Sequence, residues 1–344
     1  MPDTRELTPI EHSKAPYYWG IDVGGTGIKM GLVDSEGQTV AFEAIQTLAD
    51  DGGPAAIERV SKHVSLMEES LGLKGQVPYV GLGAPGPMDL RLGLLVEPPQ
   101  LPKWHGYGIV EDLQKRIERP IIFLNDANAA AYGEFWVGGG RTSASMLLLT
   151  LGTGVGGGIV NDNQLINGVN SFGSECGHIV VDSRDDARLC GWGGGRGQLE
   201  AYASATGVAI EARKRLEEGV ESTLRELPSE RVTSKAVYLA ALKGDQMAVE
   251  LVDETAYWLG VGITSLVHTL DPGVVVLGGA MNFGGLHDPI GQRFLRGIVE
   301  EFKRRTFEQV FEGTKIEFAT LGSDAGFLGL AGYARREHTF PTSI

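Results

Sequence analysis

The chain has 344 residues, 42% hydrophobic and 22% charged, which is enough to fill the cores of two ordinary domains. Its formal net charge of −14 opposes binding to a phosphate backbone, so a direct nucleic-acid partner is not expected. The sequence has no run of 18 apolar residues, no secretory leader, and two cysteines that make no disulfide framework. These features predict a cytoplasmic enzyme without a membrane span.

The first third of the chain predicts a small α/β unit. Residues 1–16 are polar with scattered prolines and predict a loose leader. Residues 17–46 alternate as strand, glycine turn, strand, polar turn and strand, which is typical of an antiparallel meander. Pro54 favours the start of a helix, and apolar residues spaced by three and four continue that helix to Leu71. A strand at 77–84, a helix at 107–118, a buried strand at 120–126 and an alanine-rich helix follow.

A second copy of the first strand–turn–strand unit occupies residues 146–162, with Thr150 standing 128 residues after Asp22. Repeats of this length indicate duplicated domains. A helix with apolar positions from Val249 to Leu270, and a third strand with glycines at 273–285, complete the pattern. We therefore expect two α/β lobes of similar topology facing each other across a cleft, with a boundary near residues 125–140.

The first glycine turn, "DVGGTGIK", is a candidate phosphate site. Dinucleotide fingerprints and P-loops both lead into a helix, whereas a strand follows here, so both are rejected. Two interpretations remain: an ordinary tight hairpin, or a hairpin whose amides and Thr26 hydroxyl face an anion. Asp22 beside it is either a carboxylate for water-mediated Mg²⁺ or a cap on the turn.

Asn125 and Asp126 lie where a buried strand stops and a helix begins. One interpretation is a helix N-cap, which favours these residue types. The other is a carboxylate at the carboxyl end of a strand, where α/β sheets bind ligands and where it can accept a hydroxyl proton. Further along, Glu175 can accept two hydrogen bonds from sugar hydroxyls. His178 is expected in a strand, where a lone histidine is more often structural.

Together these segments resemble the ROK family of bacterial sugar kinases and sugar-responsive repressors, within the actin-like ATPase superfamily. The likeness runs from about Trp19 to about Arg335. "DVGGTGIK" and "LGTGVGGGIV" resemble the phosphate motifs, "GLGAPGPMD" the sugar-side loop and "NDANAAAYGE" the catalytic segment. "ECGH" resembles a sugar-binding motif, "DPGVVVLGGAMNFGG" the adenosine segment and "LGSDAGFLGLAGYA" the closing helix.

The resemblance implies a duplicated actin-like, ribonuclease H-like α/β fold. Its small lobe would span residues 17–127, completed by a closing helix at 325–344, and its large lobe residues 128–324. Asp126 would be the catalytic base. The implied sugar-binding residues are Gly86, Asn125, Asp126, Glu175, His178 and Glu200. The implied residues for ATP and its phosphates are Asp22, Gly24, Gly25, Thr26, Lys29, Thr153, Gly154, Gly278 and Gly279.

Among the family's kinases the chain is most similar to glucokinases, which implies ATP with Mg²⁺ as donor, glucose as acceptor and a homodimer. Kinases for fructose, N-acetylmannosamine or N-acetylglucosamine, and a polyphosphate-dependent glucokinase, remain alternatives. A sugar-sensing regulator is disfavoured, because about sixteen residues before the first strand are too few for a helix-turn-helix.

One departure from the family concerns zinc. Relatives usually carry a C-x-C-G-x-x-G-C-x-E motif, whose cysteine positions fall here on Gly191, Gly193 and Gln198. Because His178 and Cys190 supply two ligands at most and structural zinc takes four, no structural zinc is expected. Five of the seven residues from 191 to 197 are glycine, so something else must fix this loop. Trp192 packed inward, or Arg196 paired with a carboxylate, are the two candidates.

Overall fold

The computed structural model describes residues 5–341, so the ends of the predicted leader (1–4) and closing helix (342–344) lie outside the described residues. The chain divides into two compact units. Unit 1 comprises Met1–Arg141, Asn167–Gly173 and Ser323–Ile344, and unit 2 comprises Thr142–Ile166 and Ser174–Gly322. Each unit contains one five-stranded sheet.

The sheet of unit 1 has the strand order β3-β2-β1-β4-β7. Its first three strands are antiparallel, whereas β4 is parallel to β1 and β7 is parallel to β4. The predicted meander is therefore confirmed. The strands of unit 1 are β1 Tyr18–Val23, β2 Gly27–Val33, β3 Thr39–Gln46, β4 Val80–Ala84, β7 Ile121–Asn125 and the short pair β5 Met88–Asp89 and β6 Leu94–Leu95.

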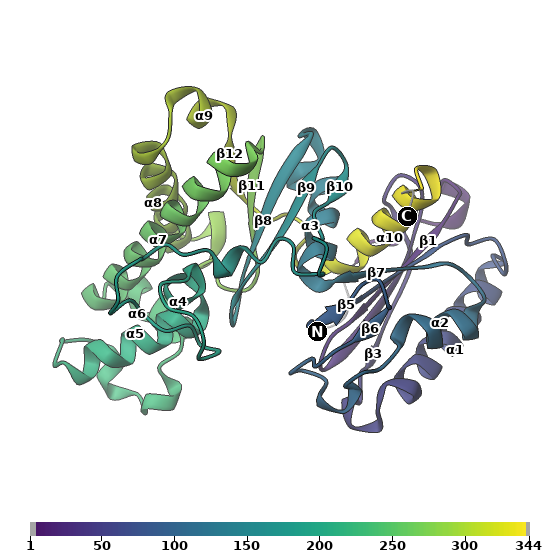
Figure 1. The fold of residues 1–344 in the computed structure, drawn as a ribbon, viewed down its shortest axis with the longest axis horizontal. Coiled ribbons are helices and arrows are strands. Elements are labelled where there is room, and N and C mark those ends of the chain that lie inside the picture. The colour runs from purple at the N-terminus through teal and green to yellow at the C-terminus, as the bar shows by residue number, and fades with distance from the viewer. Residues whose placement is uncertain (1–4, 342–344) are drawn as a thin grey trace. The chain divides into compact units, whose positions relative to one another are not determined.

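The helices of unit 1 are α1 Gly53–Leu71, α2 Ile109–Ile117, α3 Asp126–Trp136 and α10 Ala325–Thr339. The apolar faces of α1 and α2 join the strands in one hydrophobic core. The helix α10, yellow in Figure 1, contacts β1, β4 and α3. A Cβ at Gly20 of β1 would lie 1.8 Å from the Phe327 carbonyl oxygen, so glycine is required for this close approach.

The sheet of unit 2 has the order β10-β9-β8-β11-β12 and repeats the hairpin of unit 1. The predicted repeat is confirmed, with one difference in the turn. Four residues separate the innermost pair Val23 and Ile28, whereas three separate Leu151 and Val155. The strands are β8 Ser145–Leu151, β9 Val155–Asn161, β10 Gln164–Leu165, β11 Val274–Gly278 and β12 Lys315–Phe318.

The predicted long helix of unit 2 is confirmed as α7, Gln246–Leu270, whose apolar face packs in the core with α8. It starts where Asp245 accepts a hydrogen bond from the Ala248 N–H and ends at Asp271, which has a left-handed φ of 48°. Within residues 5–341, no helix is long and apolar enough to cross a membrane. The other helices are α4 Leu199–Ala203, α5 Ala205–Glu217, α6 Ser234–Leu242, α8 Pro289–Arg305 and α9 Glu308–Gly313.

The strand predicted around His178 is wrong, because Cys176–His178 form a 3-10 turn, η5. A Cβ at Gly177 would lie 2.0 Å from the Val155 carbonyl oxygen, so the turn presses its backbone directly onto β9. Cys176 is buried while Val180 is exposed, and the alternation read from the sequence therefore does not place them on one face.

Candidate active site

The turn between β1 and β2 presents backbone N–H groups. The Gly24 N–H donates to the Gly27 carbonyl, and Thr47 donates to the carbonyls of Thr26 (3.1 Å) and Gly24 (2.6 Å). The N–H groups of Gly25 and Thr26 have no hydrogen-bond partner among the described residues. With the exposed Thr26 hydroxyl, they form the kind of concave amide surface that binds anions.

Asp22 lies next to this turn, and no described residue donates a hydrogen bond to its carboxylate. The interpretation as a turn cap is therefore wrong. Burial first, and the charge of Asp126 second, raise the pKa of Asp22 to about 6. A Cβ at Gly326 would lie 2.4 Å from Asp22 Oδ2, so a glycine keeps this space open. Lys29, from β2, donates through Nζ to the Ser323 carbonyl at 2.6 Å.

Of the two residues predicted as a helix cap or a catalytic carboxylate, the structure makes Asn125 the cap and leaves Asp126 as the candidate carboxylate. Asn125 is the N-cap of α3, since its Oδ1 accepts the Asn128 N–H at 2.7 Å. Asp126 is therefore not needed as the cap, although its Oδ1 accepts the Ala127 N–H at 2.8 Å. Burial raises the pKa of the Asp126 carboxyl, and the hydrogen bond from the Ala127 N–H partly opposes this rise.

The predicted residues of unit 1 gather at one edge of its sheet. Asp22 pairs with Gly83 across β1 and β4, and Ala84 pairs with Asn125 across β4 and β7. These strands are parallel, so Asp22 near the end of β1, the loop with Gly86 after β4, and Asp126 after β7 all lie at the carboxyl edge of the sheet. This is the edge at which open α/β sheets bind ligands.

The turn between β8 and β9 in unit 2 is a second amide surface. The Gly152 N–H donates to the Gly154 carbonyl at 3.0 Å. The start of α5 holds the turn, because the Ala205 N–H donates to Gly152 and the Thr206 hydroxyl donates to Thr153. Among the described residues, the N–H groups of Thr153 and Gly154 have no hydrogen-bond partner.

Glu200 of α4 is tied to this second turn. Its Oε2 accepts the Val155 N–H at 2.9 Å, and a Cβ at Gly154 would lie 2.2 Å from the same oxygen. Its Oε1 lies 3.9 Å from the Cys190 sulfur. Burial, with Glu200 as the second cause, raises the pKa of the Cys190 thiol, which is therefore neutral near pH 7.

The end of β11 also meets the turn in unit 2. Gly279 has a φ of +89°, and a Cβ there would lie 2.2 Å from the Leu151 carbonyl oxygen. The Met281 N–H donates to the same oxygen at 2.9 Å. The predicted adenosine residues Gly278 and Gly279 therefore border the predicted phosphate residues of unit 2.

The imidazole of His178 makes contacts that the sequence analysis did not predict. Its Nδ1 lies 3.2 Å from Gln198 Oε1, which also accepts the Trp192 indole N–H at 3.2 Å. The rings of His178 and Trp192 meet edge to face with centroids 6.1 Å apart. On the other side, His178 Nε2 lies 3.8 Å from Glu175 Oε2. Gln198 stands where the family motif has a cysteine, and this position could have indicated a residue close to His178.

Both candidates for fixing the glycine loop are wrong as stated. Trp192 is 60% exposed and does not pack inward. Arg196 donates through Nη1 to the Ala187 carbonyl at 3.0 Å, not to a carboxylate. The loop is held mainly by its own backbone, with the Cys190 N–H bonded to the Gly195 carbonyl at 2.7 Å and an isolated β-bridge between Leu189 and Arg196.

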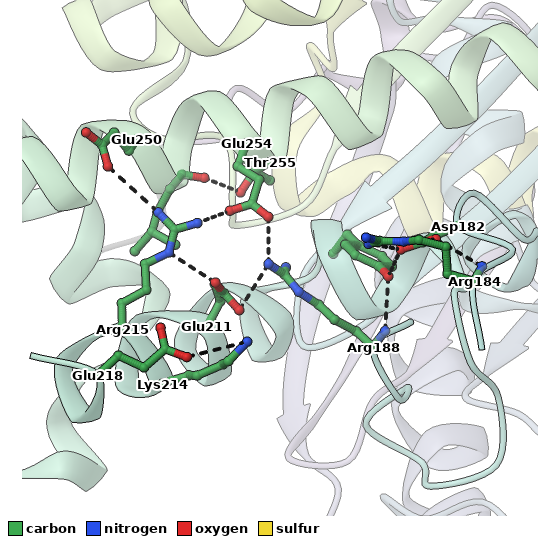
Figure 2. Close-up of polar contacts among 12 residues, drawn as sticks. Asp182, Arg184, Arg188, Glu211, Lys214, Arg215, Glu218, Glu250, Glu254 and Thr255 are labelled. Atoms are coloured by element: carbon green, nitrogen blue, oxygen red, sulfur yellow. Dashed lines mark hydrogen bonds and ion pairs between the residues drawn. The ribbon is translucent and has the colours of Figure 1, made fainter. Parts of the chain in front are cut away.

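An ionic network anchors the start of this loop (Figure 2). Arg188 Nη2 lies 3.0 Å from Glu211 and 2.6 Å from Glu254, and Arg215 pairs with the same two carboxylates. The Arg188 N–H donates to the Tyr202 hydroxyl at 3.0 Å. These partners come from α4, α5 and α7, so the loop is braced by helices that contribute to the core of the unit.

Tyr202 connects this network to Asp182, whose Oδ2 accepts the tyrosine hydroxyl at 2.7 Å. Arg184 first, and Tyr202 second, hold the pKa of the Asp182 carboxyl well below its usual range. Across residues 5–341, no three His, Cys, Asp or Glu side chains come together in a group suited to a metal ion.

Comparisons with known proteins place this geometry in a family. The model of the ROK family matches residues 18–337. A glucokinase of Halalkalibacterium halodurans is 36% identical over 91% of this chain and 93% of its own length. The ROK hexokinase structure from Thermus thermophilus is 30% identical, with a TM-score of 0.81 over 94% of this chain and 99% of its own. A ROK glucokinase from Streptomyces griseus, solved with glucose and AMPPNP, is 30% identical, with a TM-score of 0.70 over 93% of this chain and 100% of its own.

Proposed function

The chain belongs to the ROK family and has its two-lobed, actin-like α/β fold, and on that premise we propose that it transfers the γ-phosphoryl group of ATP to a hexose, glucose first among them. The predicted family and fold are confirmed. The glucokinase and hexokinase relatives support a hexokinase-type phosphotransferase. From the resemblance, we further propose a homodimer in the cytoplasm.

The two glycine turns are the observation that carries the proposal. Each leaves two N–H groups without partners among the described residues, at Gly25 and Thr26 in unit 1 and at Thr153 and Gly154 in unit 2. Phosphoryl transfer requires mainly positioning and neutralisation of charge on the phosphates, which such amides supply. Gly278 and Gly279 border the second turn and are proposed to lie against the adenosine.

Mg²⁺ accompanies ATP and neutralises charge on its phosphates. Asp22 fits a water-mediated contact with this ion, because a carboxylate is the hard oxygen ligand that Mg²⁺ prefers and Gly326 keeps the space beside it open. Gly24 shapes the turn, whereas Lys29 is already bonded to Ser323 and is proposed only to balance the charge of Asp22.

Asp126 is proposed as the general base. Its carboxylate follows β7 at the ligand edge of the sheet, and its raised pKa suits proton transfer. It would accept the proton of the sugar's 6-hydroxyl while that oxygen attacks the γ-phosphorus in line, so that the new O6–P bond forms as the bond from the γ-phosphorus to the oxygen of the departing ADP breaks. The sugar's other hydroxyls are assigned to the backbone at Gly86 and to the side chains of Asn125, Glu175, His178 and Glu200.

A coupled assay tests this function. The purified chain is offered glucose, fructose, N-acetylmannosamine or N-acetylglucosamine, each with ATP or with polyphosphate as the donor. Formation of glucose 6-phosphate from ATP and glucose, with the highest kcat/KM of the panel, supports the proposal. Turnover confined to another sugar or to polyphosphate replaces the substrate assignment, and the absence of turnover with every pair contradicts the kinase assignment.

A further inference from the structure

The side chain of Gln198 lies between an indole and an imidazole in unit 2. We infer that Gln198 is a positioning residue that holds His178 in the tautomer with its proton on Nδ1, so that Nε2 accepts a hydrogen bond from a sugar hydroxyl. The second half of this inference rests on the proposed function. The first half concerns the free protein alone.

The Trp192 indole determines which way the Gln198 amide points. An indole N–H donates and never accepts, so the atom 3.2 Å from Trp192 Nε1 must be the amide oxygen. A flipped amide would place its NH₂ group against another donor. A Cβ at Gly194 would lie 1.6 Å from the indole ring and one at Gly195 would lie 2.2 Å from Gln198 Oε1, so two glycines of the loop provide the space for this pair.

The amide oxygen in turn determines the proton position on His178. The oxygen is an acceptor, so Nδ1, which lies 3.2 Å away, must carry the proton to make a hydrogen bond. In the neutral ring, Nε2 then holds a lone pair. Nε2 is 3.8 Å from Glu175 Oε2, beyond hydrogen-bond distance.

The geometry therefore places two acceptors side by side, one on His178 and one on Glu175. A vicinal diol offers two neighbouring O–H donors and suits such a pair, with one hydroxyl donating to the imidazole and the other to the carboxylate. An imidazole with the proton on Nε2 would instead present a donor and select a different hydroxyl arrangement. The Trp192–Gln198 pair consequently controls which face of a sugar this unit accepts.

The tautomer is measured by ¹⁵N-resolved NMR of the histidine rings in the ligand-free full chain, with the His178 signals assigned from their loss in His178→Asn. The wild type should show a protonated Nδ1 and a bare Nε2. Gln198→Leu should move the proton to Nε2, and Gln198→Glu, which retains an acceptor oxygen, should keep it on Nδ1. A wild-type ring protonated on Nε2, or on both nitrogens, overturns the inference.

Steady-state kinetics test the link to the sugar. Gln198→Leu should raise the KM for the best hexose about tenfold, with kcat and the KM for ATP changed less than about twofold, since one hydrogen bond is redirected. Gln198→Glu should restore most of the affinity. Gln164→Leu, at an exposed glutamine of β10, is the matched control and should change nothing.

Trp192→Phe provides a second route if Gln198→Leu does not fold. The side chain is 60% exposed, and phenylalanine keeps a ring beside His178 while removing the N–H that orients the amide. It should give a mixture of tautomers and an intermediate KM. An unchanged hexose KM in variants with an altered tautomer contradicts the sugar contact. If the wild type phosphorylates no sugar, the proposed function fails, whereas the NMR result still decides the tautomer.

Discussion

The β1–β2 and β8–β9 hairpins are copies of one unit, yet their surroundings differ. The first turn has the carboxylate of Asp22 beside it and is held by its own Gly24–Gly27 hydrogen bond and by two hydrogen bonds from Thr47. The second has Thr150 at the matching place and is held by α4 and α5, with Glu200 bonded to its Val155 N–H. Both copies keep the amide turn, but the first has a carboxylate on its own strand, Asp22, whereas the second is braced by helices α4 and α5.

We expect the two copies to have different roles because of this difference. In unit 1 the acidic groups Asp22 and Asp126 occupy the sheet edge, and each has a pKa above its ordinary value. In unit 2 the turn is bonded to a carboxylate that is proposed to bind the sugar. Unit 1 is therefore expected to supply the base and the Mg²⁺ contact. In unit 2, sugar binding at Glu200 is expected to affect the β8–β9 turn, because Glu200 accepts the Val155 N–H.

Loss of the proposed base in unit 1 should have the largest effect. Asp126→Asn keeps the size and hydrogen-bonding shape of the side chain but cannot accept the proton, so kcat should fall about 10²- to 10⁴-fold while sugar binding is largely spared. Initial rates and a sugar-binding titration measure the two effects. Asp50→Asn, at a side chain that is 89% exposed, is the control. A near-normal rate in Asp126→Asn would remove this residue from the chemistry.

Substituting the two residues at matching positions, one in each hairpin, compares the copies directly. Asp22→Asn should lower kcat/KM for MgATP about 10- to 100-fold, because the proposed charged contact to the ion would be lost. Thr150→Val, which has a similar shape, should lower it less than about threefold. Rates at varied ATP and fixed saturating sugar measure both. Equal losses in the two variants would mean that the copies share the nucleotide chemistry.

Methyl groups added to the two turns should affect different substrates. In Gly154→Ala the new Cβ meets Glu200 Oε2, so the carboxylate must move and the KM for the sugar should rise about fivefold. In Gly25→Ala the nearest atom is Gln100 Cβ at 3.1 Å, and the KM for ATP should change instead. Gly152→Ala has no atom within 4 Å and serves as the control. If Gly154→Ala changes only the KM for ATP, Glu200 does not couple the turn to the sugar.

The smallest effect concerns the stability of unit 1 as a function of pH. The pKa of Asp22 is about 6 in the folded chain, above its ordinary 3.8, so ionised Asp22 costs folding free energy above pH 6 and costs none below about pH 4. Asp22→Asn should therefore raise the free energy of unfolding by about 1–3 kcal/mol at pH 8 and leave it unchanged near pH 4. Urea unfolding at both pH values measures this difference. A variant less stable than the wild type at pH 8 would contradict the burial cost.

The hairpins and long helices were predictable because their signals are local. The alternation from Ile28 to Val33 and the steps of three and four along α7 are read within a few residues. Local signals did not show which of Asn125 and Asp126 is the helix cap, since either residue type can cap a helix. The duplication of the hairpin was visible, but its one-residue shorter turn depends on pairing that the sequence does not display.

The contacts that fix the glycine loop were not predictable in the same way. Arg188 pairs with Glu254, which lies 66 residues further along the chain, and His178 contacts Gln198, which lies 20 residues further along. Trp192 was one of two candidates for fixing the loop, by packing inward, yet its side chain is 60% exposed and its indole N–H donates to Gln198. Such pairings depend on the three-dimensional packing of α5, α7 and the loop, and no spacing in the chain encodes them.

The position of α10 has a consequence for synthesis of the protein. Unit 1 begins with β1 but is completed by Ala325–Thr339, after nearly all of unit 2 has been made. Until that helix leaves the ribosome, the glycine-lined surface of β1 and β4 has no cover, whereas both segments of unit 2, 142–166 and 174–322, have already been synthesised. Substitutions along α10 should therefore reduce the yield of folded protein in cells more than the turnover of the molecules that do fold.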